Sequence, residues 1–232
     1  MKNLKNVSSK LKKLNYLKKS KKNLDFLSTL INYKIYLGDK KNTWDPSISG
    51  YLYGIRNGFC IFDLNKTILN LKKSLKLISH VNKSNKKILF IGFPKNFEDK
   101  CVKLYNKNGH FYVSNKSWVN GILTNSKDFF YLKNSFLLNL KNKKIKEKRF
   151  FYEKFGGILN LKNKPSLIVV FDHGKNLDAI REASGINVPI ISFINSNNDT
   201  KFVDYPITGN FNSKNFSKLY YNLIKNALSW KI

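Results

Sequence analysis

Short, uninterrupted apolar runs alternate with amphipathic helical segments along most of this chain of 232 residues, and this alternation restricts its fold more than any other feature. Because the runs lack the polar alternation of a half-exposed strand, both faces of each predicted strand should be buried. The helical segments would then cover both faces of one sheet. The sequence therefore predicts an α/β fold, flavodoxin-like or Rossmann-like, with a mainly parallel sheet and helices on both faces. The predicted strands are 58–64, 87–93, 110–114, 166–172 and 189–195, and the clearest helices are 65–81, 176–184 and 213–230.

Three further segments complete the predicted organisation. Residues 24–37 are predicted to form a helix that stops at Gly38. Residues 1–22 contain nine lysines and no acidic residue, so they form either an arm that folds on RNA or a solvated tail. Residues 129–154 are rich in Lys and predict helical segments that project from the core. We therefore expect a basic N-terminal extension (1–24), an α/β core (25–128 and 155–232) and a helical insertion (129–154).

The strong positive charge points to a polyanionic partner. The chain has 43 basic and 14 acidic residues, which gives a formal net charge of +29. Nucleic acid fits this balance, because each phosphate that a protein neutralises releases condensed counterions. An anionic membrane surface fits less well, since the lysines are spread along the chain instead of lying on one amphipathic helix. No apolar run approaches the roughly 18 residues of a membrane span. The abundance of Lys, Asn, Ile, Phe and Tyr, with only three Arg, is typical of an AT-rich genome such as that of an organelle.

Polar residues at the carboxyl ends of predicted strands are the candidates for catalysis, because ligands bind there in such sheets. Asp63, Asp172 and Asn195 hold these positions. Asp172 and His173 are adjacent and could form the acid–base pair of a nucleotide-binding enzyme. The competing interpretation is a polar strand end with Gly174 easing the turn, since neighbouring side chains of an extended segment point apart. The chain has no phosphate-binding GxGxxG or GxxxxGK[ST] motif and no GxSxG elbow. The polar strand end is therefore favoured, and the enzyme stays as the alternative.

Metal and cofactor sites are not expected. Cys60 and Cys101 lack CxxC spacing and lie in predicted elements, so we expect buried, unreactive thiols. With three scattered histidines, they do not suggest the roughly four ligands of a zinc site. Trp44 and Trp118 each follow lysines and could stack on bases, although tryptophan is more often a partly buried anchor.

Five blocks of the sequence, taken in their order along the chain, can be compared with the sequence patterns of known protein families. They read YLGDKKNTWDPSISGYLYGIRNGFCIFDLNKT (36–67), SWVNGILTN (117–125), EKFGGI (153–158), PSLIVVFDHGKNLDAIREASGINVP (165–189) and IISFINSNNDTKFVDYPITGN (190–210). Together they resemble the bacterial-type family of small-subunit ribosomal protein 2, over about residues 26–230. The chain departs from the family pattern at Tyr36, Leu37 and Asp39 around Gly38, at Asn120 and at Thr200. The family's long helical hairpin is also shortened, to about residues 126–154.

The resemblance implies a non-catalytic, structural constituent of the small ribosomal subunit. Its partners would be rRNA and neighbouring ribosomal proteins, with no cofactor, small-molecule substrate or membrane. The composition favours a mitochondrial ribosome, with a plastid or an AT-rich bacterial cytoplasm as alternatives. A protein that binds any polyanion through charge alone is a further alternative. The rRNA-binding candidates are chosen for their place in the family blocks and for their side-chain chemistry. They are Lys40, Lys41, Trp44, Arg56, Asn57, Lys66, Trp118, Thr124, Asn125 and Lys127. Of these, Asn57 and Thr124 could hold their loops together instead of binding rRNA.

Overall fold

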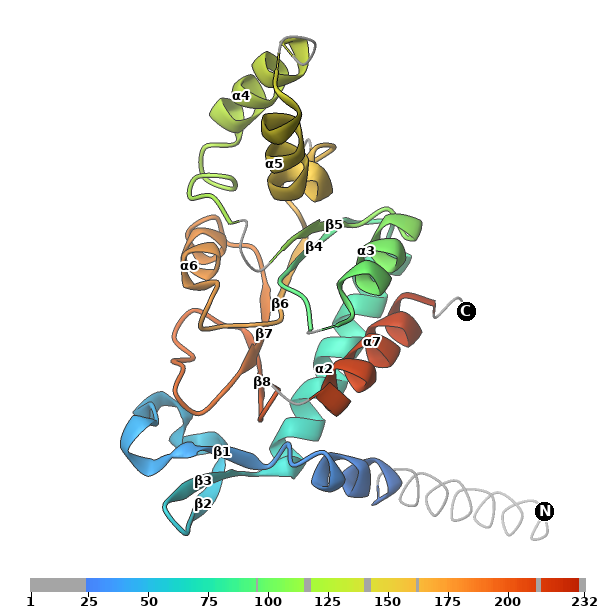
Figure 1. The fold of residues 1–232 in the computed structure, drawn as a ribbon. Coiled ribbons are helices and arrows are strands. Elements are labelled where there is room, and N and C mark those ends of the chain that lie inside the picture. Colours follow the sequence, from blue (N-terminus) through green and yellow to red (C-terminus); the bar gives the residue numbers. More distant parts are fainter. Residues whose placement is uncertain are drawn as a thin grey trace, which may run out of the picture.

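The computed structural model describes residues 24–94, 96–114, 118–139, 143–161, 163–211 and 214–229 (Figure 1). The side chains of residues 126–130, 132 and 214 are outside this description. The predicted basic arm, residues 1–22, also lies outside the described residues.

Five parallel strands form the central sheet, in the order β5-β4-β6-β7-β8. With the strands renumbered from the first, this order is 2-1-3-4-5, the order of flavodoxin-like folds. The prediction of an α/β fold with a mainly parallel sheet is therefore confirmed. The strands are β4 (Ile88–Ile91), β5 (Phe111–Val113), β6 (Leu167–Val170), β7 (Ile190–Ile194) and β8 (Tyr205–Thr208).

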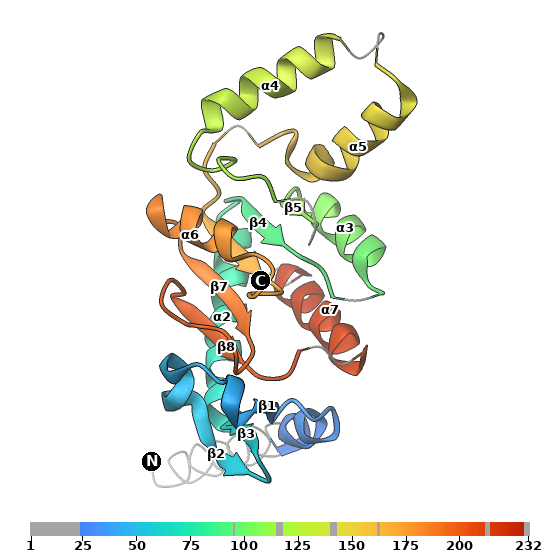
Figure 2. The same ribbon diagram turned by 60° about the vertical axis from the view of Figure 1, so that its left-hand side comes forward.

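Helices cover both faces of this sheet, so its strands are buried on both sides (Figures 1 and 2). Helices α2 (Leu64–Lys83), α3 (Glu98–Lys107) and α7 (Lys214–Ser229) pack on one face, against residues such as Phe90 and Val169. Helix α6 (Leu177–Gly185) packs on the other face, against residues such as Leu89 and Ile168. Alternate residues of β4 and of β6 thus belong to two separate cores, which explains their uninterrupted apolar runs.

A second, antiparallel sheet lies beyond the β8 edge of the first. Its strands, β1 (Leu37–Lys40), β3 (Phe59–Phe62) and β2 (Leu52–Arg56), are paired in that order. The prediction that the strand at 58–64 belongs to the main parallel sheet is therefore wrong. Asn57 and Gly58 both have positive φ, 50° and 77°, and form a two-residue hairpin turn that pairs β3 with the preceding strand instead.

The helix predicted over 24–37 is shorter than expected and ends at residue 32. Lys34 takes a left-handed conformation, with φ of 54°, and the Ile35 amide donates to the Leu30 carbonyl at 3.1 Å. This is the hydrogen bond of a Schellman helix end, which a non-glycine residue forms here. The helix thus ends five residues earlier than predicted, and β1 begins at Leu37.

Two helices, α4 (Ser126–Leu138) and α5 (Ile145–Phe155), project beyond the β5 edge of the sheet (Figure 2). They contact each other through Phe136 and Phe151, whose rings stack with centroids 3.8 Å apart. The 3-10 helix η4 (Gly156–Ile158) then leads the chain back to the sheet. No helix among the described residues has the length and apolar character needed to cross a membrane.

Candidate nucleic-acid interface

The predicted rRNA-binding residues fall into two groups that the structure does not bring together. Six of them surround the antiparallel sheet, and three lie on the loop over 118–125, next to α6 (Figure 1). Lys127 is in the first turn of α4, and its side chain lies outside the described residues. The first group is Lys40, Lys41, Trp44, Arg56, Asn57 and Lys66, and the second is Trp118, Thr124 and Asn125.

The loop between β1 and β2 is fixed by Asp45 and Ser196. It consists of two 3-10 helices, η1 (Lys41–Thr43) and η2 (Pro46–Tyr51). The Asp45 carboxylate caps η2 by accepting from the Ser47 amide at 2.8 Å. Hydrogen bonds from the Ser47 side chain and from this amide lower the pKa of Asp45. The Asp45 amide donates to the Ser196 carbonyl at 2.8 Å. Trp44 is therefore held half-buried between two anchored elements, and Lys41 is exposed.

Gly38 allows β1 to approach the end of β7 closely. A Cβ atom there would lie 2.9 Å from Ser196 Oγ and 3.2 Å from Cys60 Cβ. The Asp39 amide donates to Ser196 Oγ at 2.6 Å, and that hydroxyl donates to the Asp39 carboxylate at 3.2 Å. A glycine at position 38 is therefore needed for the two sheets to pack together.

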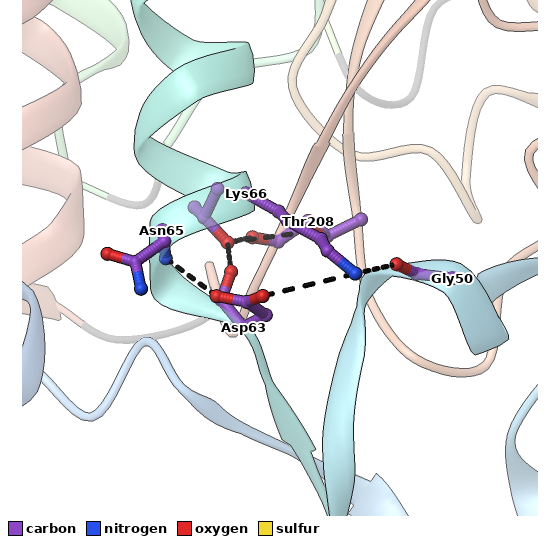
Figure 3. Close-up of polar contacts among 6 residues, drawn as sticks. Gly50, Asp63, Asn65, Lys66 and Thr208 are labelled. Atoms are coloured by element: carbon purple, nitrogen blue, oxygen red, sulfur yellow. Dashed lines mark hydrogen bonds and ion pairs between the residues drawn. The ribbon is translucent and has the colours of Figure 1, made fainter.

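Lys66 joins helix α2 to the same loop (Figure 3). Its ammonium group donates to the Gly50 carbonyl at 2.6 Å and lies 3.9 Å from the Asp63 carboxylate. Asp63 in turn caps α2, accepting from the Asn65 amide at 2.9 Å. One further turn into the helix, the Thr67 hydroxyl donates to the Thr208 carbonyl at 2.8 Å. Because half of the Lys66 side chain remains exposed, it can hold the loop and still face an anion.

Asn57 forms the turn of the β2–β3 hairpin. Its left-handed backbone and that of Gly58 set the register in which Arg56 lies opposite Phe59. The Lys41 amide donates to the Gly58 carbonyl at 2.8 Å, which ties η1 to this turn. Arg56 and Lys40 are both exposed around it.

The loop over 118–125 is fastened to α6 by one carboxylate, that of Glu182. This carboxylate accepts from the Trp118 indole at 3.3 Å, the Gly121 amide at 2.7 Å and the Leu123 amide at 3.2 Å. Trp118 is thus half-buried with its polar atom already bonded within the protein. Thr124 and Asn125 line an open cleft of about 430 Å³, whose other side is formed by Asp178, Arg181 and Glu182.

Asp172 and His173, the proposed acid–base pair, point in different directions. The Asp172 carboxylate pairs with Lys175 at 2.5 Å on the surface. His173 is buried, with Nδ1 3.2 Å from Ser192 Oγ and Nε2 3.5 Å from the Asp199 carboxylate. Burial lowers the pKa of His173, and Asp199 opposes that shift. Although serine, histidine and aspartate adjoin, the Ser192 side chain is completely buried, so no substrate reaches its hydroxyl.

Both cysteines lie within the described residues, in β3 and α3. Cys60 and Cys101 are both unpaired and buried, which confirms the prediction of buried thiols. Burial raises the pKa of Cys101 to about 11, so its thiol is unreactive at neutral pH. The described part of the chain contains no cluster of three or more His, Cys, Asp or Glu side chains placed to bind a metal ion.

Glu182 and Ser196 were missed by the sequence analysis. Both act through contacts with distant segments: Glu182 bonds to Leu123, 59 residues away, and Ser196 bonds to Asp39, 157 residues away. Neither position has a local motif that signals such a role. Glu182 stands on the predicted helix inside one of the family blocks, and that membership was the only available signal.

Comparison with known proteins gives one consistent result. The family model described as "Ribosomal protein S2" matches residues 30–230. The chain is 30% identical over 217 residues to "Small ribosomal subunit protein uS2" of Treponema pallidum (strain Nichols), a match that covers 87% of this chain and 74% of that protein. It is 32% identical over 215 residues to the protein of the same name from Bartonella henselae, covering 85% and 82% of the two chains. The corresponding protein of Rickettsia rickettsii is 31% identical over 217 residues, covering 87% and 73%.

Proposed function

Because the chain belongs to the ribosomal protein S2 family, we propose that it is a structural constituent of the small ribosomal subunit. The observation that carries this proposal is the family match over residues 30–230, which spans both sheets and helices α2 to α7. The relatives reported above are named as proteins of the small ribosomal subunit. Their family is one of structural proteins and not of enzymes, in line with the separated Asp172 and His173 side chains.

The partners that we propose are rRNA and neighbouring ribosomal proteins. With a net charge of +29, the basic side chains would repel one another strongly unless phosphates balanced their charge. Neutralising these phosphates lets rRNA helices approach one another, and the rigid five-stranded sheet holds the contacting loops in fixed positions. The role of the protein is thus in assembly and in maintaining the geometry of the subunit during translation.

Within this role, the predicted rRNA-binding residues differ in their exposure and in their hydrogen bonds within the protein. Lys40, Lys41 and Arg56 are exposed and suited to phosphate contacts. Lys66 combines an internal hydrogen bond with a half-exposed side chain. Trp118 is bonded to Glu182 and contributes to the surface mainly by holding its loop.

We further propose a mitochondrial ribosome as the location. The support is compositional: lysine greatly exceeds arginine, and Asn, Ile, Phe and Tyr are abundant, as in proteins from AT-rich organellar genomes. The relatives named above are bacterial, which suits an organelle of bacterial descent and equally suits a plastid or a bacterium.

Sucrose-gradient fractionation of native lysate, probed for this chain in low and moderate salt, tests the proposal. We expect co-migration with the small ribosomal subunit that persists in moderate salt. Gradients of purified mitochondria, plastids and cytoplasm identify the compartment. A pool that stays at the top of every gradient would contradict the ribosomal role.

A further inference from the structure

One face of the antiparallel sheet carries an aromatic ring between two cations. Phe59 lies on the central strand, β3, directly opposite Lys40 on β1 and Arg56 on β2. Side chains of directly paired residues project from the same face of an antiparallel sheet. Lys40, Phe59 and Arg56 therefore form one row across all three strands.

The next row along the same face is Leu37, Ile61 and Gly54. A Cβ atom built on Gly54 meets nothing within 4 Å, so no described residue covers the sheet at that point. Phe62, which alternates with Ile61, packs instead with Ile48 and Ile194 in the small core beneath. The face with Phe59 is thus the outer face, and Phe59 is 38% exposed.

The charge on this outer face is positive. Lys40 and Arg56 flank the ring, and Lys41 follows directly in η1, all of them exposed. The acidic side chains near these residues are engaged elsewhere. Asp39 pairs with Ser196, and Asp45 caps η2. An anionic partner would meet cations on both sides of an accessible ring.

We propose that this face, formed by Lys40, Phe59, Arg56, Ile61 and Gly54, stacks an unpaired nucleobase of single-stranded RNA on the Phe59 ring. The proposal rests on the proposed rRNA partner and names the element of that RNA. A ring on a sheet surface stacks on bases that are not already stacked in a helix, and flanking cations bind the phosphates on either side. Gly54 leaves room for the base beside the ring.

Fluorescence of single-stranded RNA that carries one 2-aminopurine tests the stacking, since an aromatic ring on that base quenches its emission. With the full chain, we expect quenching on binding. We expect Phe59→Leu, which keeps an apolar side chain without a ring, to lose the quenching and to bind about 5- to 100-fold more weakly. Phe59→Tyr should retain both. Binding to an RNA duplex of equal length should be the same for all three proteins.

Phe150→Leu is the matched control, because Phe150 is also an exposed ring with a lysine over it, Lys154, but lies on α5. It should leave quenching and affinity unchanged. The inference is overturned if Phe59→Leu binds the single strand as the natural chain does, or if it loses duplex binding to the same extent.

Replacing Phe59 by the photoreactive p-benzoylphenylalanine identifies what lies on this face in the native particle. We expect crosslinks to rRNA. Crosslinks to a ribosomal protein, or to residues 1–23 of the same chain, would overturn the inference. The ribosomal role is judged separately by co-sedimentation, so a chain that co-sediments but gives no RNA crosslink disproves only the stacking face.

Discussion

At the scale of single residues, Gly156 and Gly157 are neighbours with opposite tolerance of a side chain. A Cβ atom on Gly157 would overlap the backbone carbonyl oxygen and the ring of Tyr112, on β5. A Cβ atom on Gly156 meets nothing within 4 Å. We expect Gly157→Ala to lower the free energy of unfolding by about 1–3 kcal/mol, because the backbone of β5 has to move. Gly156→Ala should change it by less than about 1 kcal/mol. Denaturant unfolding of both variants checks this, and equal effects would contradict the packing described for η4.

His110 predicts a specific dependence of stability on pH. Burial, with Lys87 nearby, lowers its pKa to about 4, from an ordinary value of 6.5. Its Nε2 lies 3.1 Å from the Asn82 side-chain oxygen, and its buried Nδ1 has no partner among the described residues. Between about pH 6.5 and 4, the unfolded chain binds a proton that the native chain does not, so stability falls as pH falls through this range.

The size of the effect follows from the two pKa values. At about 1.4 kcal/mol per pKa unit, the loss attributable to His110 is at most about 3.5 kcal/mol. Unfolding of His110→Gln, measured from pH 7 to pH 4, should show a shallower decline than the natural chain. The exposed His80 provides the control, and His80→Gln should keep the full decline. A parallel decline in His110→Gln would show that other groups cause the pH dependence.

Residue-scale prediction from sequence succeeded where the strand geometry is regular. The alternation of side chains along an extended segment predicted that Asp172 and His173 point apart, as they do. It could not predict that His173 meets Ser192, because that contact depends on the pairing of β6 with β7. Lys66 shows the same limit, since its hydrogen bond to Gly50 depends on how the loop folds back on α2.

At the scale of elements, Glu182 holds the loop over 118–125 to helix α6. Its three acceptor bonds to that loop are charge-assisted, and the Leu123 side chain beside them is buried. We expect Glu182→Ala to cost about 2 kcal/mol or more, because the Gly121 and Leu123 amides lose their acceptor. It should also open the loop to limited proteolysis.

Asp178→Ala is the control for Glu182. Asp178 is on the same helix, but its carboxylate is largely exposed and forms a surface ion pair with Arg181, at 3.7 Å. Its removal should cost under about 1 kcal/mol and leave proteolysis of the loop unchanged. Should Glu182→Ala be no more susceptible to proteolysis than Asp178→Ala, the loop does not depend on Glu182.

Prediction of elements from the sequence failed at strands β1, β2 and β8. Strand β8 went unpredicted because it includes Pro206, which is unusual within a sheet. Strands β1 and β2 were not predicted either, and they join one sheet because the Asn57–Gly58 turn brings β3 back between them. The long apolar runs of β4, β6 and β7 were predicted, since burial on both faces leaves a clear signal.

At the scale of the whole molecule, net charge and local charge make different predictions about RNA binding. If only the total of +29 matters, any two exposed lysines are equivalent. If the antiparallel sheet carries the interface, Lys40 and Lys41 matter more than two exposed lysines elsewhere. The pair Lys218 and Lys225, exposed on α7, provides the comparison.

The dependence of RNA affinity on salt separates these two cases. Each phosphate that loses its contact should reduce the slope of log affinity against log salt concentration by about 0.7 to 0.9. We therefore expect the double variant Lys40→Gln, Lys41→Gln to reduce the slope by about 1 to 2. The double variant Lys218→Gln, Lys225→Gln should reduce it by less than about 0.5, because those side chains lie outside the proposed interface. Filter binding to small-subunit rRNA from low to physiological salt measures both slopes. Equal slopes for the two variants would mean that charge alone drives binding, which would return the chain to the class of general polyanion binders.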